Sequence, residues 1–263
     1  MTGGPKNLTL VVPVFNEASR WNKVYWKRLL SISEIDWIFV NDGSSDNTSG
    51  IMEHLKNLPN AEVIEHATNR GKAEAIKSGF NHFFARYPIL GVKQVFIGYL
   101  DADEAFNPEE IERFFNLTVN DSSSLFSQGF QAIWSSRVQL RGRNIVRKKY
   151  RHYLGRAIAS LFGSAFPSIP YDSQSGFKIF VLDDLLPKIF IENFKTKWFV
   201  DLEIAIRYQN ISRREFRVWE EPLLYWKDVG GSAIKMRNFP NVFIEIIRIY
   251  FLLRKANKGA IYN

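Results

Sequence analysis

Two hydrophobic periods alternate along the first hundred residues, and this alternation constrains the fold more than any other feature. Leu8–Phe15 is a continuous apolar run, as is typical of a strand buried on both faces. Apolar residues then recur at helical spacing from Trp21 to Ile32, and the same change of period happens twice more. The pattern predicts an α/β fold in which a mostly parallel sheet carries helices on both faces. The expected strands are Leu8–Phe15, Trp37–Val40, Ala61–Ile64 and Val95–Leu100.

The rest of the chain is less regular, but it shows no convincing linker between domains. A length of 263 residues, 46% of them hydrophobic, suits one large α/β domain. We expect this domain to span residues 1–235, followed by an amphipathic helical segment, residues 236–263, packed on the domain or on a membrane surface. A further helix is expected within Asn144–Phe166, which is basic and then apolar. Further strands are expected at Gln131–Ser135, Phe177–Val181 and Phe216–Trp219.

Basic residues are unevenly distributed, which predicts an anionic partner. The formal net charge is +8, and no Asp or Glu occurs from Ser122 to Tyr171. A phosphate ligand, an anionic membrane surface or a nucleic acid would each fit this charge. No apolar run reaches the length of a membrane span, and the nearest candidate, Val242–Leu253, contains Glu245 and Arg248. We expect a cytoplasmic protein, peripheral on the cytoplasmic membrane face, without a secretion signal or a cysteine-based site.

Asp101 and Asp103 carry the strongest chemical signal. Two carboxylates separated by one residue, directly after a buried strand, can face one divalent cation together. Mg²⁺ and Mn²⁺ favour carboxylate and phosphate oxygens, and such an ion would bridge the protein to a diphosphate and stabilise it as it leaves. An isolated Asp-x-Asp is more often a solvated turn or a helix cap before Pro108. Its position after a fourth strand favours the metal site, because ligands bind beyond the carboxyl ends of such strands.

The turns after the second and third strands suggest nucleotide contacts. In the string NDGSSDNT, Gly43 permits a tight turn, and Ser45 or Asp46 can cap the next helix. That leaves Asp42 at the strand end, where its carboxylate could accept hydrogen bonds from a nucleobase or ribose. Asn69–Lys72 opens the third helix with exposed backbone N–H groups and two cations, which together make an anion site. The plainer alternatives are a capped turn and a solvated helix start.

These signals, in this order and spacing, resemble the family 2 glycosyltransferases of the GT-A fold. The matching strings are VVPVFNE, VNDGSSDNT, NRGKAEAIKSGF and LDADEAF. Three later strings, DSQSGFK, WFVDLE and EPLLYWKDVGGSAIK, are similar to the dolichyl-phosphate glucosyltransferase and mannosyltransferase branch. The resemblance runs from about Leu8 to Lys235. Ala73 stands where many relatives have Gly. Ala105 stands where mannosyl relatives often carry a metal-binding Gln, which favours the glucosyl side or leaves a water on the metal.

The resemblance implies roles for individual residues. Contacts to the nucleotide sugar are implied for Pro13, Phe15, Glu17, Asp42, Arg70, Lys72 and Ala102. Metal binding is implied for Asp101 and Asp103, and catalytic roles are implied for Asp172, Asp201 and Glu203. Arg137, in a Ser-Ser-Arg string, would contact phosphate. Arg147 and Arg151 are one helical turn apart and would share one helix face, so we expect them to bind the acceptor phosphate as well.

The implied activity is inverting transfer of a hexose from a nucleotide sugar to a polyprenyl or dolichyl phosphate, with Mg²⁺ or Mn²⁺ as cofactor. Glucose and UDP-glucose are the first choices. Because the acceptor phosphate is already an anionic nucleophile, positioning would dominate catalysis, and Asp201 would either act as a base or hold hydroxyls of the sugar. Two alternatives stay open: a family 2 enzyme with a saccharide or protein hydroxyl acceptor, and a non-catalytic nucleotide- or nucleic-acid-binding protein. The intact Asp-x-Asp argues against a non-catalytic binding protein, so we expect no nucleic acid among the partners. The basic stretch leads us to expect an anionic membrane surface as a partner.

Overall fold

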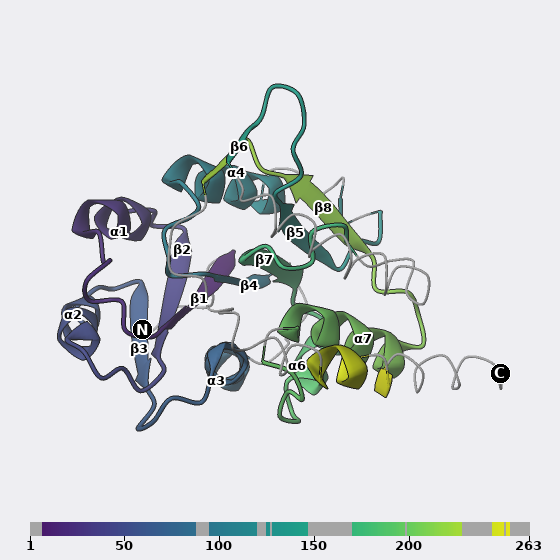
Figure 1. Ribbon diagram of the computed structural model, residues 1–263, viewed down its shortest axis with the longest axis horizontal. Coiled ribbons are helices and arrows are strands. Elements are labelled where there is room, and N and C mark those ends of the chain that lie inside the picture. The colour runs from purple at the N-terminus through teal and green to yellow at the C-terminus, as the bar shows by residue number, and fades with distance from the viewer. Residues whose placement is uncertain are drawn as a thin grey trace.

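The computed structural model is an α/β structure built around a seven-stranded sheet (Figure 1). It describes residues 7–87, 95–119, 125–126, 128–146, 170–197, 199–227, 244–249 and 251–252. The strands of the sheet are β1 (Leu8–Val14), β2 (Ile35–Asn41), β3 (Ala61–Glu65), β4 (Phe96–Leu100), β5 (Ala132–Ser136), β7 (Phe177–Val181) and β8 (Val218–Pro222). The helices are α1 (Lys23–Leu30), α2 (Thr48–Leu55), α3 (Lys72–Arg86), α4 (Pro108–Val119), α6 (Leu186–Ile189) and α7 (Val200–Ser212).

The strand order of the large sheet is β3-β2-β1-β4-β7-β5-β8. Neighbouring strands are parallel from β3 to β4 and again between β5 and β8, whereas β7 is antiparallel to both β4 and β5. Two short strands, β6 (Asn144–Val146) and β9 (Tyr225–Lys227), form a separate parallel pair. The predicted mostly parallel sheet is therefore confirmed. The carboxyl ends of β1, β2 and β4 meet at one edge, which places their polar loops together.

Each face of the sheet has its own hydrophobic core. Along β1, Leu10 and Val12 pack with α1, α2 and α4, while Val11 packs with α3, α6 and α7. In Figure 1, α1 and α4 lie above the sheet, and α3, α6 and α7 lie below it. On the lower side, the rings of Phe80 and Phe190 stack at 4.3 Å. Burying one such side chain contributes about 1.5–3 kcal/mol. Burial on both faces explains why the strands read as continuous apolar runs.

Two predicted elements differ from the structure. The first three residues of the helix expected within Asn144–Phe166 form β6 instead, because Ile145 is buried opposite Trp226 of β9. The rest of that expected helix lies outside the described residues. The last strand of the large sheet begins at Val218, two residues later than the predicted start at Phe216, and its register with β5 extends to Pro222.

The C-terminal segment is partly described. Residues 244–249 and 251–252 are helical, and Ile249 is buried against the lower core. The backbone N–H of Lys197 donates to Glu245 at 2.9 Å, which ties this helix to the segment before α7. Within the described residues, no helix combines the length and the apolar character needed to cross a membrane. The proposed boundary at residue 235 and a contact of this helix with a membrane stay predictions.

Candidate active site

The loops after β1 and β2 are fastened to each other. Asn16 has a positive φ of 53°, and its side chain accepts a hydrogen bond from the Ser45 N–H at 2.8 Å. The N–H of Glu17 donates to the Thr48 hydroxyl at 2.9 Å. Glu17 is buried, which raises the pKa of its carboxyl, and Arg20 opposes this effect from 2.5 Å. The predicted base-pocket residues Pro13, Phe15 and Glu17 therefore lie at the end of β1, beside the turn that follows Asp42.

Asp42 holds the loop that precedes α3. Its Oδ1 accepts from the Arg70 N–H at 2.9 Å, and its Oδ2 accepts from the Gly71 N–H at 2.7 Å. The loops are so close that a Cβ on Gly43 would lie 2.3 Å from the carbonyl carbon of Thr68. The predicted nucleobase contact would thus come from a carboxylate that also fixes the Arg70–Gly71 backbone.

His66 extends this arrangement and was not singled out in the sequence. Its Nδ1 lies 2.8 Å from Asp42 Oδ1, and its Nε2 lies 2.9 Å from the hydroxyl of Ser78 on α3. In a neutral ring, Nδ1 donates because the carboxylate oxygen accepts, and Nε2 then accepts from the hydroxyl. The available signal was a histidine directly after the third strand, a position at the ligand-binding edge of the sheet.

Arg70 and Lys72 have different surroundings. Arg70 is half exposed, and its guanidinium lies 3.7 Å from Glu74. Lys72, the first residue of α3, reaches the end of β4, where its Nζ lies 2.5 Å from Asp101 Oδ1. Partial desolvation disfavours the charge of Lys72, whose side chain is 39% exposed, but Asp101 and Asp201 outweigh this effect and raise the pKa of Lys72. An ammonium group thus stands beside the first carboxylate of the Asp-x-Asp.

The Asp-x-Asp itself lies directly after β4. The Asp101 N–H donates to the Gly176 carbonyl at 2.9 Å, and a Cβ on Gly176 would lie 2.3 Å from Asp101 Oδ2. Only glycine at position 176 therefore leaves room for the carboxylate in this orientation. Burial and the negative charge of Asp101 raise the pKa of Asp103 to about 6. A cation bound between the two acids would relieve this repulsion.

A divalent metal fits these residues when a ligand completes the site. Among the residues that the structure describes, no group of three or more His, Cys, Asp or Glu side chains is arranged to hold a metal ion. Mg²⁺ is commonly bound through one or two carboxylates together with substrate phosphates. Two crowded carboxylates, one with a raised pKa, match that requirement. Lys72 supplies the positive charge next to Asp101 in this structure.

Arg137 and Asp172, predicted to contact phosphate and to act in catalysis, form a buried ion pair. Arg137 directly follows β5, and its Nε and one terminal nitrogen each donate to the Asp172 carboxylate at 2.7 Å. The Arg137 N–H donates to Asp172 as well, at 2.8 Å. Despite burial, the Asp172 charge raises the pKa of Arg137. The Arg137 guanidinium lies 5.2 Å from the Trp226 ring centre, so Trp226 of β9 packs against the arginine of this pair.

Asp201 lies in the first turn of α7 and faces the sheet. Burial raises the pKa of Asp201 to about 7, although the charge of Lys72 opposes this change. Its Oδ1 accepts a hydrogen bond from the Tyr99 hydroxyl on β4 and lies 3.2 Å from Lys178 Nζ on β7. Tyr99 and Lys178 were not singled out in the sequence. The signal for Lys178 was a cation inside an otherwise apolar strand.

Glu203 is occupied by local structure. Its carboxylate accepts from the N–H groups of Lys195 and Thr196 at 3.0 Å and lies 2.7 Å from the Arg207 guanidinium. Glu203 thereby pins the segment before α7. A contact of Glu203 with a substrate stays a prediction without support from these hydrogen bonds. Arg147 and Arg151 lie outside the described residues.

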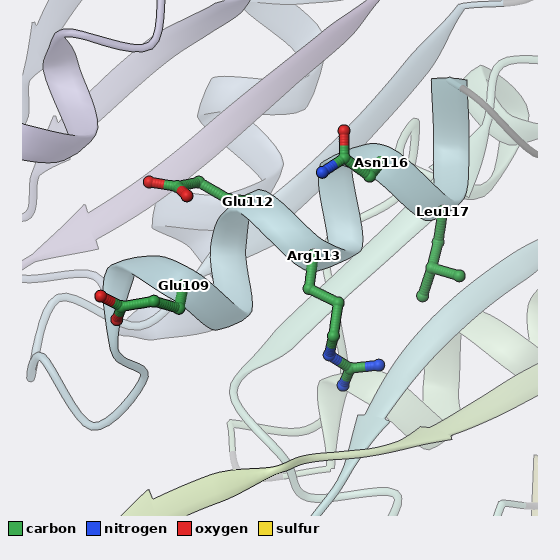
Figure 2. Close-up of a pocket in the computed structure, with 5 residues that line it drawn as sticks. All are labelled: Glu109, Glu112, Arg113, Asn116 and Leu117. Carbon is green, nitrogen blue, oxygen red and sulfur yellow. The ribbon is translucent and has the colours of Figure 1, made fainter.

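A surface depression on α4 is separate from this cluster. Figure 2 shows its lining side chains, which all come from α4: Glu109, Glu112, Arg113, Asn116 and Leu117. Its carboxylates pair with Arg28 of α1, at 2.5 Å and 3.2 Å. Arg113 pairs with Glu110 at 2.8 Å and with Glu221. These charges are already balanced by neighbours, so the depression offers little to an ionic ligand.

Comparisons with known proteins agree with this architecture. Residues 9–167 match the model of glycosyl transferase family 2. The chain is 28% identical over 253 residues to dolichyl-phosphate beta-glucosyltransferase ALG5A of Trichomonas vaginalis, covering 92% of this chain and 72% of that protein. It is 26% identical over 272 residues to dolichyl-phosphate beta-glucosyltransferase of Saccharomyces cerevisiae, covering 94% and 75%.

A solved structure supports the fold. The glucosyl-3-phosphoglycerate synthase of Mycobacterium tuberculosis, crystallised with Mn²⁺, UDP and glucosyl-3-phosphoglycerate, superposes with a TM-score of 0.60 at 13% identity. The alignment covers 94% of this chain and 80% of that one. This likeness confirms the GT-A-like fold. Since the family model matches more than half of the sequence, the chain belongs to glycosyl transferase family 2.

Proposed function

We propose that this glycosyltransferase moves a hexose from a nucleotide sugar to a polyprenyl phosphate with inversion at the anomeric carbon. Glucose is the proposed sugar and UDP-glucose the proposed donor. The observation that carries the proposal is the convergence of Asp101, Asp103, Lys72 and Asp201 at the carboxyl edge of the sheet. The dolichyl-phosphate beta-glucosyltransferases similar to this chain over more than nine-tenths of its length support the choice of acceptor.

The donor side of the proposed site consists of the first four strand ends. Pro13, Phe15 and Glu17 would line the base pocket, and Asp42 would fix the Arg70–Gly71 backbone beside the nucleotide. Lys72 and Ala102 would lie along the diphosphate. The Asp-x-Asp would hold Mg²⁺ or Mn²⁺, which when bound neutralises charge on the diphosphate as it leaves. The Mn²⁺ and UDP in the mycobacterial synthase support this assignment.

The acceptor determines what Asp201 does. With a polyprenyl phosphate, an acceptor oxygen is already anionic and attacks the anomeric carbon without loss of a proton. Asp201 then accepts hydrogen bonds from hydroxyls of the sugar and positions it for attack. Arg147 and Arg151 would bind the acceptor phosphate. Arg137 would contribute its positive charge from within the pair with Asp172.

One observation favours a second candidate, transfer to a saccharide or protein hydroxyl. A hydroxyl must lose its proton during attack, and a general base works best when its pKa lies near the operating pH. The pKa of Asp201, raised to about 7 by burial, meets this condition. The two candidates share the donor site and differ in the acceptor.

An acceptor panel separates the two candidates. The purified protein is incubated with UDP-glucose and Mn²⁺ and offered polyprenyl phosphate, an oligosaccharide or water, with EDTA as the control for metal dependence. We expect glucosyl transfer to polyprenyl phosphate that stops in EDTA. Transfer to the oligosaccharide alone would contradict the proposal and support the second candidate. Undiminished turnover in EDTA would contradict the metal site.

We further propose that the protein is peripheral on the cytoplasmic membrane face. The stretch without acidic residues begins at Ser122, and its described part exposes Leu140 and Val146 near Arg141. Apolar and cationic side chains together suit an anionic bilayer surface. Vesicle sedimentation should show binding to anionic vesicles that weakens with salt. Equal binding to neutral and to anionic vesicles would contradict an electrostatic contribution to membrane binding.

A further inference from the structure

Lys178 occupies a position where a core residue is expected. It lies in β7 between Phe177 and Ile179, and its cross-strand partners are Tyr99 of β4 and Trp134 of β5. Its side chain is 0% exposed. Burial and the repulsion from Lys72 lower the pKa of Lys178 well below its ordinary value. A buried lysine lowers the stability of the fold unless it is paired. The groups that Lys178 contacts therefore indicate which part of the site it serves.

The partners of Lys178 point to the proposed reaction centre. Nζ donates to the Ser175 carbonyl at 2.5 Å and lies 3.2 Å from Asp201 Oδ1. It also lies 4.8 Å from the centre of the Trp134 ring and 5.5 Å from that of Tyr99. These contacts hold Nζ against the carboxylate of Asp201. The same carboxylate oxygen accepts from the Tyr99 hydroxyl, so a hydroxyl donor and the Lys178 amine both contact it.

Tyr99 links this pair to the donor side. Lys72 Nζ also lies 5.5 Å from the centre of the Tyr99 ring, while it contacts Asp101. One aromatic ring is therefore the common neighbour of two lysine–carboxylate pairs, Lys72 with Asp101 and Lys178 with Asp201. Lys178 contacts Asp201 directly, whereas it interacts with Lys72 and Asp101 through their charges, so a change at Lys178 should reach Asp201 first.

We propose that Lys178, supported by Tyr99, is a positioning residue that orients the Asp201 carboxylate for the transferred sugar. The inference rests on the role of Asp201 in the proposed function. Because Lys178 acts on Asp201 and not on the nucleotide loops after β1 and β2, its removal affects turnover more than donor binding. A variant that lowers kcat and kcat/KM equally has lost an interaction made in the transition state.

The test compares two buried lysines. Lys178→Met keeps the volume and removes the amine, and Lys77→Met is the matched control. Lys77 is also buried, but its Nζ donates to the Asn193 side chain at 2.5 Å, whereas the Nζ of Lys178 contacts the Asp201 carboxylate. With UDP-glucose, we expect Lys178→Met to lower kcat roughly tenfold or more with the donor KM within about threefold, because the donor loops keep their contacts. Lys77→Met should keep wild-type kcat. Wild-type kcat in Lys178→Met, or an equal loss in Lys77→Met, overturns the inference.

A pH profile adds a readout that a purely structural role would not change. Among described residues, the groups facing Asp201 are Tyr99 from β4, Lys178 from β7 and Lys72 from α3. Without the amine the carboxylate is harder to ionise, so its pKa rises and the acid limb of kcat moves to higher pH. An unmoved acid limb contradicts the inference. If Lys178→Met does not fold, Tyr99→Phe replaces it as the test, because this change removes only the hydroxyl oxygen that donates to Asp201. For Tyr99→Phe we expect a smaller loss of kcat at unchanged KM. Wild-type kcat in Tyr99→Phe would contradict the inference.

Hydrolysis of UDP-glucose by water, without any polyprenyl phosphate, separates this inference from the proposed acceptor. If the wild type hydrolyses the donor but glucosylates no polyprenyl phosphate, the proposed function fails. A loss of that hydrolysis in Lys178→Met, with Lys77→Met unaffected, still supports the positioning role. Equal hydrolysis by Lys178→Met and the wild type rejects it whichever acceptor is correct.

Discussion

Charged side chains are paired differently at the ends of strands β1 to β4, the first region, and at the ends of strands β5 to β8, the second region. In the first region, Asp101 and Asp103 lie together, and burial and mutual repulsion raise the pKa of Asp103 to about 6. In the second region, Arg137 forms a bidentate pair with Asp172, and in α7, which follows β7 in the chain, Arg207 contacts Glu203 at 2.7 Å. The first region thus has a charge arrangement that a cation would improve, whereas the second is largely balanced within the protein. This difference supports the proposal that ligands bind in the first region, while much of the second contributes rigidity.

The largest effect is expected from removing one of the two crowded acids. Asp103→Asn leaves Asp101 without its partner, so metal-dependent transfer should fall roughly a thousandfold, about 4 kcal/mol of transition-state stabilisation. The measurement is kcat/KM for UDP-glucose over a Mn²⁺ titration. Glu104→Gln is the matched control, because Glu104 accepts from the Asn22 N–H instead, at 2.8 Å. Full activity of Asp103→Asn would remove the distinction between the regions.

Breaking the Arg137–Asp172 pair tests the balanced region. Asp172→Ala leaves a buried guanidinium unpaired, which should lower the free energy of unfolding by about 3 kcal/mol. Urea denaturation measures this change. Removing both partners, in Arg137→Met with Asp172→Ala, should cost less than the single change because no buried charge remains unpaired. A stability of Asp172→Ala within about 1 kcal/mol of the wild type would show that the pair is not a structural element.

The sequence predicted the first region better than the second for a physical reason. Asp101 and Asp103 are two residues apart and follow a strand, so local periodicity was enough to bring them together. Arg137 and Asp172 are 35 residues apart, and β7 enters the sheet antiparallel between β4 and β5. No local pattern encodes that register. Arg137 and Asp172 were therefore identified as site residues, but their pairing with each other was not predicted. Lys178 and Tyr99 were missed because both lie inside apolar strands.

Arg147 and Arg151 sharpen the comparison from the acceptor side. They lie outside the described residues, so their placement is still a prediction from helical spacing. If they bind the acceptor phosphate, replacing either with Ala should raise the acceptor KM or lower kcat about tenfold, since a charged hydrogen bond contributes ~1.5–3 kcal/mol. Replacement with Lys should restore activity in part, because the bidentate fork is lost. Donor binding, measured by thermal shift without acceptor, should stay unchanged. Wild-type transfer by both Ala variants would reject the polyprenyl-phosphate assignment.

The smallest effect is expected at His66, and it asks whether the first region also depends on an internal anchor. His66→Phe removes one hydrogen bond to Asp42 while the Arg70 and Gly71 N–H donors remain. The Arg70–Gly71 loop should loosen, raising the KM for UDP-glucose about fivefold, or about 1 kcal/mol for one hydrogen bond, with kcat unchanged. In His66→Asn the amide can take the place of Nδ1, so this variant should recover more donor affinity than His66→Gln, whose amide lies nearer the position of Nε2. If His66→Phe lowers kcat and leaves KM alone, the anchor serves the reaction centre instead of the nucleotide, and the two regions are coupled through α3.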